Sequence, residues 1–164
     1  MDQTILFAES KWKTFGALLI WLGICFGVAA LGGYATSQGL SLYYPSLRKP
    51  SWTPPGYVIG TIWQVLYTLM AIAAWLVWRK VGVFHLAIAC FILQLVLNLG
   101  WSYAFFVMQC PEFAYYELCA LWLSIAITIY FFWPISRIGA LLLVPYILWV
   151  TFAGYLNYTI WDMN

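Results

Sequence analysis

The length of the uncharged apolar segments constrains this chain most. No Asp, Glu, Lys or Arg occurs between Thr14 and Leu47, and over all 164 residues 65% are hydrophobic and 7% are charged. Soluble domains carry about 25% charged residues, so this composition excludes a soluble globular enzyme, a disordered chain and a nucleic-acid-binding protein. Roughly 20 apolar residues in a helix cross the ~30 Å hydrocarbon core of a bilayer. We therefore expect an integral membrane protein.

Five apolar segments are long enough to span a membrane. They are continuous rather than alternating, which favours helices over the strands of a β-barrel. Pro145 lies inside the last segment and predicts a kink there. The expected fold is all-α, a five-transmembrane-helix bundle in one domain over residues 1–164, with helices at about 14–38, 57–78, 84–108, 113–133 and 138–161.

Residues 39–56 form the one long connection, and we expect them to be an ordered Pro-rich loop between the first two helices. Prolines lack the N–H donor that a continuous helix needs, and aromatic residues argue against disorder. We interpret the segment as a lid over one end of the bundle. Its prolines are Pro45, Pro50, Pro54 and Pro55, and its aromatic residues are Tyr43, Tyr44 and Trp52.

The basic residues predict the orientation of the chain in the membrane. Positive residues concentrate in cytoplasmic loops. Five lie on the side of the N-terminus and two on the opposite side, so we expect a multi-pass protein of a bacterial cell membrane with its N-terminus inside. The five are Lys11, Lys13, Arg79, Lys80 and Arg137, and the two are Arg48 and Lys49.

Residues typical of metal sites and classical catalysis are scarce. His85 is the only histidine, and the four cysteines form no CxxC pair. We therefore expect no metal site, no cofactor and no classical catalytic motif. Glu117 is the only acid that we place within a span, where a carboxylate either marks a function or extends to the headgroups.

Aromatic and amide side chains share faces on three of the expected helices. An unpaired amide in an apolar helix costs a few kcal/mol, so the asparagines should face the protein interior. Helix–helix packing would explain any one of these residues, but together they suggest a pocket for a large, flat, apolar ligand. The faces are Trp63 and Tyr67; Asn98, Trp101 and Phe105; and Tyr146, Trp149, Ala153 and Asn157.

Five short motifs, in this order, resemble the tryptophan-rich sensory protein and translocator protein family, once called peripheral benzodiazepine receptors. They are LRKPSWTPPG at 47–56, WQVLY at 63–67, NLGWS at 98–102, PYILW at 145–149 and AGYLN at 153–157. The resemblance implies a five-helix membrane bundle with a cavity beneath the first loop. It also implies binding of porphyrins and, in some members, of sterols or drug-like compounds.

The resemblance assigns roles to particular positions. Some bacterial members are described as promoting light-dependent breakdown of protoporphyrin, and the tryptophans tied to that activity match Trp63 and Trp149. Tyr43–Tyr44 departs from the Trp-Tyr of many relatives, and Asp162 breaks the sterol-recognition pattern of animal relatives, which argues against cholesterol as the main ligand. Positions lining the family's pocket match Tyr67, Asn98, Trp101 and Ala153, and positions shaping the lid match Trp52, Pro54 and Pro55.

Three functions remain open at this point. The first is a membrane receptor or carrier for protoporphyrin IX or a related tetrapyrrole, whose propionates would lie near the headgroups or reach Arg48 and Lys49. The second is an enzyme-like, light-dependent degradation of protoporphyrin that uses the cavity tryptophans. The third is a regulatory scaffold that works through partner proteins. Besides the tetrapyrrole, the expected partners are membrane lipids and a second copy, with Gly100 and Ala104 as a candidate homodimer contact.

Overall fold

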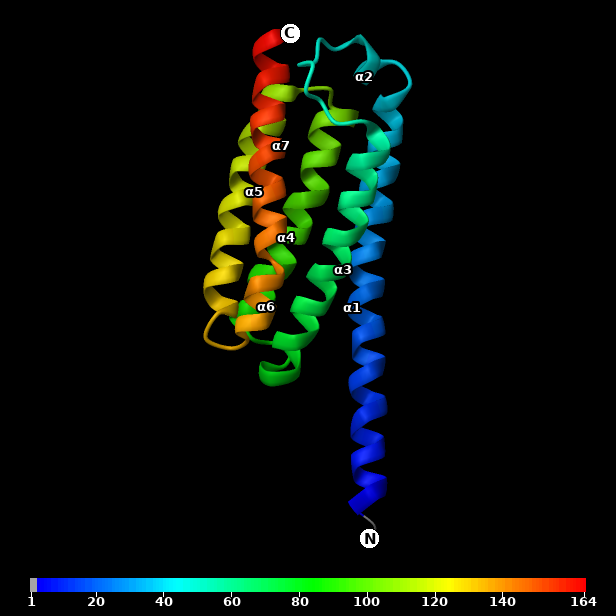
Figure 1. Ribbon diagram of the computed structural model, residues 1–164, viewed down its shortest axis with the longest axis vertical. Helices are drawn as coiled ribbons and strands as arrows, with labels where there is room; N and C mark the ends of the chain where they lie inside the picture. The colour runs from blue at the N-terminus through cyan, green and yellow to red at the C-terminus, as the bar shows by residue number, and fades with distance from the viewer. Residues whose placement is uncertain (1–2) are drawn as a thin grey trace.

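The computed structural model describes the backbone of residues 3–164 and the side chains from Thr14 onward. Within these residues the chain is all-helical, and five helical segments are long and apolar enough to cross a membrane. The helices run side by side as a bundle (Figure 1). The expected five-helix membrane fold is confirmed. Its elements are α1 (Gln3–Leu40), α2 (Tyr43–Ser46), α3 (Gly56–Val81), α4 (Leu86–Ser102), η1 (Tyr103–Val107), α5 (Pro111–Phe132), α6 (Arg137–Leu142) and α7 (Val144–Met163).

Three element boundaries differ from the expected spans. α1 begins at Gln3, so the polar lead-in is helical in backbone and continuous with the first span. The third span ends in the π-helical turn η1, which periodicity did not predict. The last span is two helices that meet at Leu143. Pro145 explains this break, because it lacks the N–H that would bond to the carbonyl of Leu141.

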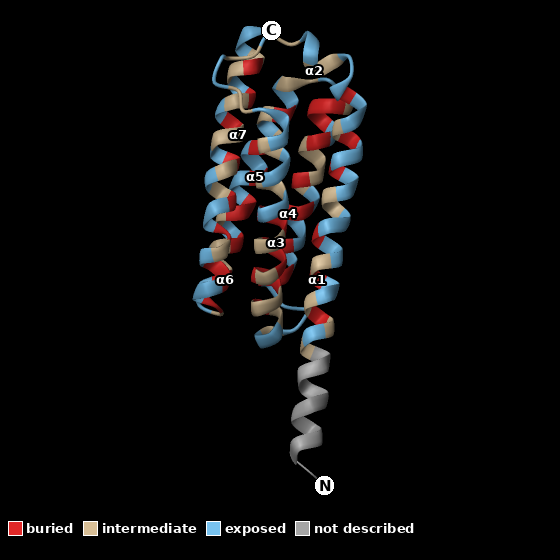
Figure 2. Ribbon diagram, turned by 45° about the vertical axis from the view of Figure 1, so that its right-hand side comes forward, coloured by how far each residue is buried: buried red, intermediate tan, exposed pale blue. Residues whose placement is uncertain are grey.

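The tightest packing lies toward the α6 end of the bundle. The rings of Phe91 on α4 and Phe132 on α5 stack there at 6.0 Å, and Met70 on α3 is fully buried. A Cβ on Gly139 would lie 3.2 Å from the carbonyl oxygen of Ala73, so glycine permits the close approach of α6 to α3. Buried residues line the inward faces of the helices (Figure 2).

The lid loop, residues 41–55, contains the short helix α2 and lies beside the C-terminus in Figure 1. Lys49 Nζ donates to the carbonyl oxygens of Tyr44 and Leu47, at 2.6 and 2.9 Å. The Asn164 side chain accepts from Arg48 N at 2.9 Å and donates to Arg48 O at 3.0 Å. These bonds explain why the loop is ordered, as the sequence predicted, and they fasten it to the end of α7.

Two polar or small-residue features of the third span serve the fold itself. His85 caps α4, because its Nδ1 accepts from the backbone N–H of Ala87 at 3.2 Å.

The Gly100–Ala104 pair does not form an outer surface, because Ala104 is 1% exposed and Gly100 faces Glu117 of α5. The expected homodimer contact at this pair is therefore wrong: the small residues are used for packing within one bundle.

Candidate ligand cavity

A cavity of about 640 Å³ lies between α1, α3, α4, η1 and α7, beneath α2 of the lid. Its volume falls within the roughly 300–1,000 Å³ of small-molecule sites. Most of the predicted binding residues line it. They come from three helices and one turn and are Trp63, Tyr67, Asn98, Trp101, Phe105, Trp149, Ala153 and Asn157.

Tryptophans from three helices provide the aromatic part of the wall. Trp63 lies on α3, Trp101 on α4 and Trp149 on α7, and each lines the cavity. Phe105 and Phe106 both line it as well, although they are consecutive. The wider π turn brings both rings inward, with Met108 N donating to Tyr103 O at 3.0 Å. π turns of this kind are frequent at functional sites.

Part of the cavity wall is made of small residues that the sequence analysis did not assign to the site. Gly32 and Gly33 on α1 and Gly56 and Gly60 on α3 all line the cavity, together with Ala29 and Ala30. A Cβ added to Gly33 or Gly60 would meet nothing within 4 Å. The absence of side chains here leaves the space that the tryptophans face. The adjacent glycines Gly32 and Gly33 are the signal in the sequence that could have indicated this wall.

A buried hydrogen-bonded chain fixes the amide of Asn98 at the cavity wall. The Tyr67 hydroxyl donates to Asn98 Oδ1, and Asn98 Nδ2 donates to the Tyr146 hydroxyl at 2.9 Å. Burying an amide without partners would cost a few kcal/mol, and this chain removes that cost by joining α3, α4 and α7. The prediction that Asn98 faces the interior is confirmed, since it is 4% exposed.

A second chain holds the Trp101 ring in place. Trp101 Nε1 donates to Asn157 Oδ1 at 3.0 Å, and Asn157 Nδ2 donates to the Pro111 carbonyl oxygen at 2.8 Å. These bonds connect α4, α7 and the beginning of α5. Asn157 is buried, as expected for an amide inside a membrane helix. Because both amide groups are occupied, Asn157 positions an aromatic wall rather than offering a free polar group.

Trp149 differs from Trp101 in its hydrogen bonding. Its Nε1 is buried and has no hydrogen-bond partner within the described residues. Its ring packs at 5.3 Å against Phe152, which also lines the cavity. A buried N–H donor without an acceptor is costly, and a bound molecule carrying an oxygen or nitrogen acceptor would remove that cost.

Four predicted binding residues lie away from the cavity wall. Tyr146 is fully buried behind Asn98 and supports it. Trp52 is 42% exposed and stacks on Tyr155 at 5.3 Å, on the outer side of α7. Pro54 and Pro55 are not among the lining residues either, and Pro55 instead precedes α3 as its N-cap. Of the lid residues, Tyr44 is the one at the cavity.

Polar groups near the lid are mostly neutral or already bonded. Burial raises the pKa of the Tyr44 hydroxyl above its ordinary value, so this residue presents a neutral hydroxyl to the cavity. Lys49 is engaged by backbone carbonyls and lies 4.7 Å over the Tyr44 ring, whereas the Arg48 side chain is exposed. Over the residues whose side chains are described, no three potential ligands among His, Cys, Asp and Glu come together to hold a metal.

Glu117 does not extend to the membrane surface. Both carboxyl oxygens are buried and have no hydrogen-bond partner in the described part of the chain. A Cβ on Gly100 would lie 3.1 Å from Oε1, so the carboxyl group lies directly against α4. Of the two interpretations that the sequence left open, extension to the headgroups is therefore wrong. Glu117 lies outside the cavity wall.

Comparison with known proteins agrees with this architecture. Residues 21–162 match the TspO/MBR family. The chain is 40% identical to the tryptophan-rich protein TspO of Chlorobaculum tepidum over 156 residues, covering 93% of this chain and 98% of that protein. It is 37% identical to protein CrtK of Rhodobacter capsulatus, covering 74% and 78%, and 34% identical to the human translocator protein, covering 80% and 79%.

The fold and the cavity define an integral membrane protein of five spanning helices with a ligand-sized aromatic cavity under a fastened lid. The chain belongs to the TspO/MBR family. Its similarity to bacterial members supports location in a bacterial membrane.

Proposed function

We propose that this protein is a membrane receptor or carrier that binds protoporphyrin IX or a related tetrapyrrole in the cavity. The observation that carries the proposal is the cavity itself, which is lined by three tryptophans and by several glycines and alanines. The small residues leave room for a wide, flat π system, and aromatic rings favour offset or edge-to-face contact with it. Cavity residues other than these remain mostly apolar, as is typical of small-molecule sites.

Two observations on the lid support a proposal for where the propionates of such a ligand would lie. Lys49 donates to two carbonyl oxygens of the lid, so an anion would have to break those bonds. The Arg48 side chain is exposed on the same loop. We therefore assign propionate contact to Arg48 and a structural role in the lid to Lys49. Arg48→Gln should weaken porphyrin binding more than sterol binding, and equal effects would contradict the assignment.

The test is a protoporphyrin titration of the protein in lipid nanodiscs in the dark, following tryptophan fluorescence and porphyrin absorbance. The proposal predicts saturable quenching that is weakened in Trp63→Phe, because Trp63 lines the cavity. The matched control is Trp133→Phe, a tryptophan outside the cavity wall and 48% exposed. Quenching that never saturates, or that both variants retain equally, would contradict binding at this site.

Light-dependent degradation of protoporphyrin is the second candidate. The specific observation is that Trp63 and Trp149 lie on different helices of the same cavity, where both could contact one bound ring. A tryptophan at van der Waals distance could exchange an electron with the photoexcited porphyrin. If this is an activity of the protein, Trp63→Phe and Trp149→Phe should each slow the loss of porphyrin absorbance under light. Unchanged rates would leave a receptor or carrier.

A further inference from the structure

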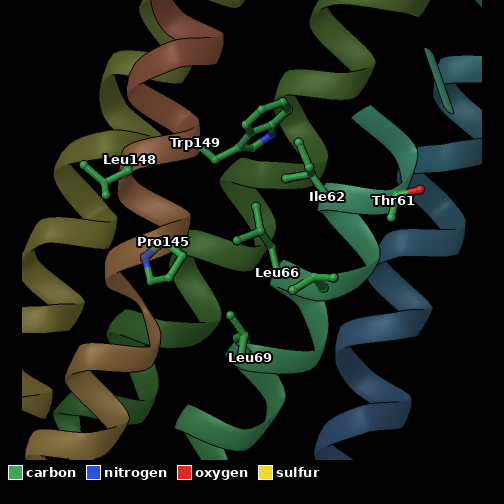
Figure 3. Close-up of a pocket in the computed structure, with 8 residues that line it drawn as sticks. Thr61, Ile62, Leu66, Leu69, Pro145, Leu148 and Trp149 are labelled. Carbon is green, nitrogen blue, oxygen red and sulfur yellow. The ribbon is translucent and has the colours of Figure 1, made fainter. Parts of the chain in front are cut away.

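A second, mostly apolar groove lies on the membrane-facing side of the bundle between α3 and α7. It has a volume of about 500 Å³ and is lined by residues including Val65 and Leu69 of α3 and Pro145 and Leu148 of α7. Figure 3 shows side chains of the two helices facing each other across it. The hydroxyl of Thr61 donates to the Tyr57 carbonyl oxygen at 2.9 Å, so it is already bonded within α3.

The break in the last span accounts for this groove. The backbones of α3 and α7 hardly approach each other, whereas α1 packs along α3 and α5 packs along α7. The chain leaves α6 at Leu143 and begins α7 at Val144, with Pro145 in the first turn. Proline cannot continue the hydrogen bonding of the preceding helix. α7 therefore diverges from α3 at this level, and the gap is left between α3 and α7.

Trp149 separates the groove from the cavity. It is the one residue that lines both. Figure 3 shows its indole extending from α7 toward the side on which Ile62 of α3 lies. Its Nε1 has no hydrogen-bond partner among the described residues. Rotation of this side chain would therefore break no protein hydrogen bond, and it would give up the packing of its ring against Phe152.

We propose that the α3–α7 groove is a lateral entrance, through which a flat apolar molecule dissolved in the bilayer reaches the cavity when Trp149 swings aside. The proposal rests on the proposed function for the identity of the molecule, a tetrapyrrole. The groove is mostly apolar along its length, and its volume is comparable to that of the cavity it adjoins. The apolar macrocycle of such a molecule would lose no favourable solvation on passing from the hydrocarbon core into the groove.

The alternative route through the lid is held by more interactions. Lys49 bonds to two carbonyl oxygens within the loop, and Asn164 exchanges two hydrogen bonds with the backbone of Arg48. Opening the lid would break the two Asn164 bonds, which join the loop to the end of α7, each worth about 0.5–1.5 kcal/mol net. In the lateral wall, Trp149 is the one residue that lines both the groove and the cavity, and its side chain makes no hydrogen bond among the described residues. The structure therefore favours uptake from the membrane over uptake from water.

The test uses a thiol inside the cavity and a reagent delivered from the lipid. Ala153→Cys is placed in a background in which Cys25, Cys90, Cys110 and Cys119 are alanine, and the protein in nanodiscs is labelled with N-(1-pyrenyl)maleimide. Val65→Trp and Leu148→Trp fill the groove from its two sides, and neither residue lines the cavity. The matched control is Leu123→Trp, on the exposed side of α5.

If the groove is the entrance, each groove variant should slow labelling by about tenfold, which corresponds to a barrier about 1.4 kcal/mol higher. Leu123→Trp should label at the parent rate. Two groove variants offer a second measurement should one of them fail to fold. Labelling at the parent rate in every folded groove variant would overturn the proposal.

Porphyrin exchange separates this proposal from the proposed function. For a lateral entrance, Val65→Trp should slow protoporphyrin uptake and release by the same factor and leave the dark Kd within about twofold, because a barrier changes rates and not the end states. Slowed maleimide labelling in a protein that binds no porphyrin would support the entrance and contradict the proposed ligand. Normal porphyrin binding with unchanged rates of uptake and labelling would contradict the entrance alone.

Discussion

At the scale of the residue, the cavity depends on which polar groups are already satisfied. Asn98 and Asn157 use their amides to hold Tyr67, Tyr146 and Trp101 in place. Trp149 Nε1 and the Glu117 carboxyl group have no partner in the described region. Asn98 and Asn157 therefore give the site its shape. Burial of the unpartnered groups of Trp149 and Glu117 costs free energy that other interactions must offset.

Removing the Glu117 carboxyl group should stabilise the bundle. In Glu117→Met two buried, unpartnered oxygens are replaced by apolar atoms of similar length, so we expect the free energy of unfolding to rise by about 1–3 kcal/mol. Thermal unfolding in detergent measures this. The control is Glu112→Met, which removes an exposed acid from the first turn of α5 and should be neutral or slightly destabilising. A lower unfolding temperature for Glu117→Met would show that the carboxyl group has a partner or role.

Replacing the Asn98 amide should lower the stability of the protein more than the size of the side chain suggests. Asn98→Leu leaves the Tyr67 and Tyr146 hydroxyls without the amide partner that each now has. We expect a loss of about 1–3 kcal/mol per unsatisfied buried group and weaker porphyrin binding. Tyr67→Phe removes one hydroxyl and should cost less. Equal stabilities of the two variants, compared by thermal unfolding, would argue against a connected chain.

At the scale of the element, the cavity requires irregular helices. The π turn of η1 brings Phe105 and Phe106 inward together, and the end of α1 passes directly beside it. A Cβ on Gly39 would lie 2.7 Å from the Phe106 carbonyl oxygen. Glycine at this position therefore permits α1 to approach η1 closely enough to close the upper end of the cavity.

Gly39→Ala should consequently destabilise the protein. The added Cβ would contact backbone atoms, which cannot move aside without distorting α1 or η1. We therefore expect the free energy of unfolding to fall by about 1–3 kcal/mol. Gly27→Ala is the matched control on the same helix, since its Cβ would meet nothing within 4 Å. Thermal unfolding of the two variants checks this, and equal unfolding temperatures would show that α1 and η1 are less closely fitted than the structure indicates.

At the scale of the whole molecule, hydropathy predicted the five spans and Pro145 predicted the break in the last one, because these features depend on local composition alone. The shared faces of Trp63, Asn98 and Trp149 followed from helical periodicity. The small-residue wall of α1 was not predicted, because glycines that open a cavity and glycines that pack helices look the same in sequence. The outward position of Trp52 depends on how the lid folds over α7, which no periodicity encodes.

The orientation of the bundle in the membrane stays a prediction at this scale. The basic residues place the N-terminus inside, so the lid and the C-terminus, which lie at the same end of the bundle (Figure 1), would face away from the cytoplasm. Arg79, Lys80 and Arg137 lie at the opposite end. A reporter fused to the C-terminus should score as non-cytoplasmic, and a cytoplasmic score would contradict the predicted orientation.

The central claim is that the cavity binds a tetrapyrrole, and a paired titration tests it most directly. Gly60→Leu places a side chain in the cavity and Gly23→Leu places the same side chain outside it, and at both positions a Cβ meets nothing within 4 Å. In the dark, Gly60→Leu should weaken protoporphyrin binding by about tenfold or more, or about 1.4 kcal/mol, whereas Gly23→Leu should bind like the parent protein. Equal affinity in both variants would contradict binding in this cavity.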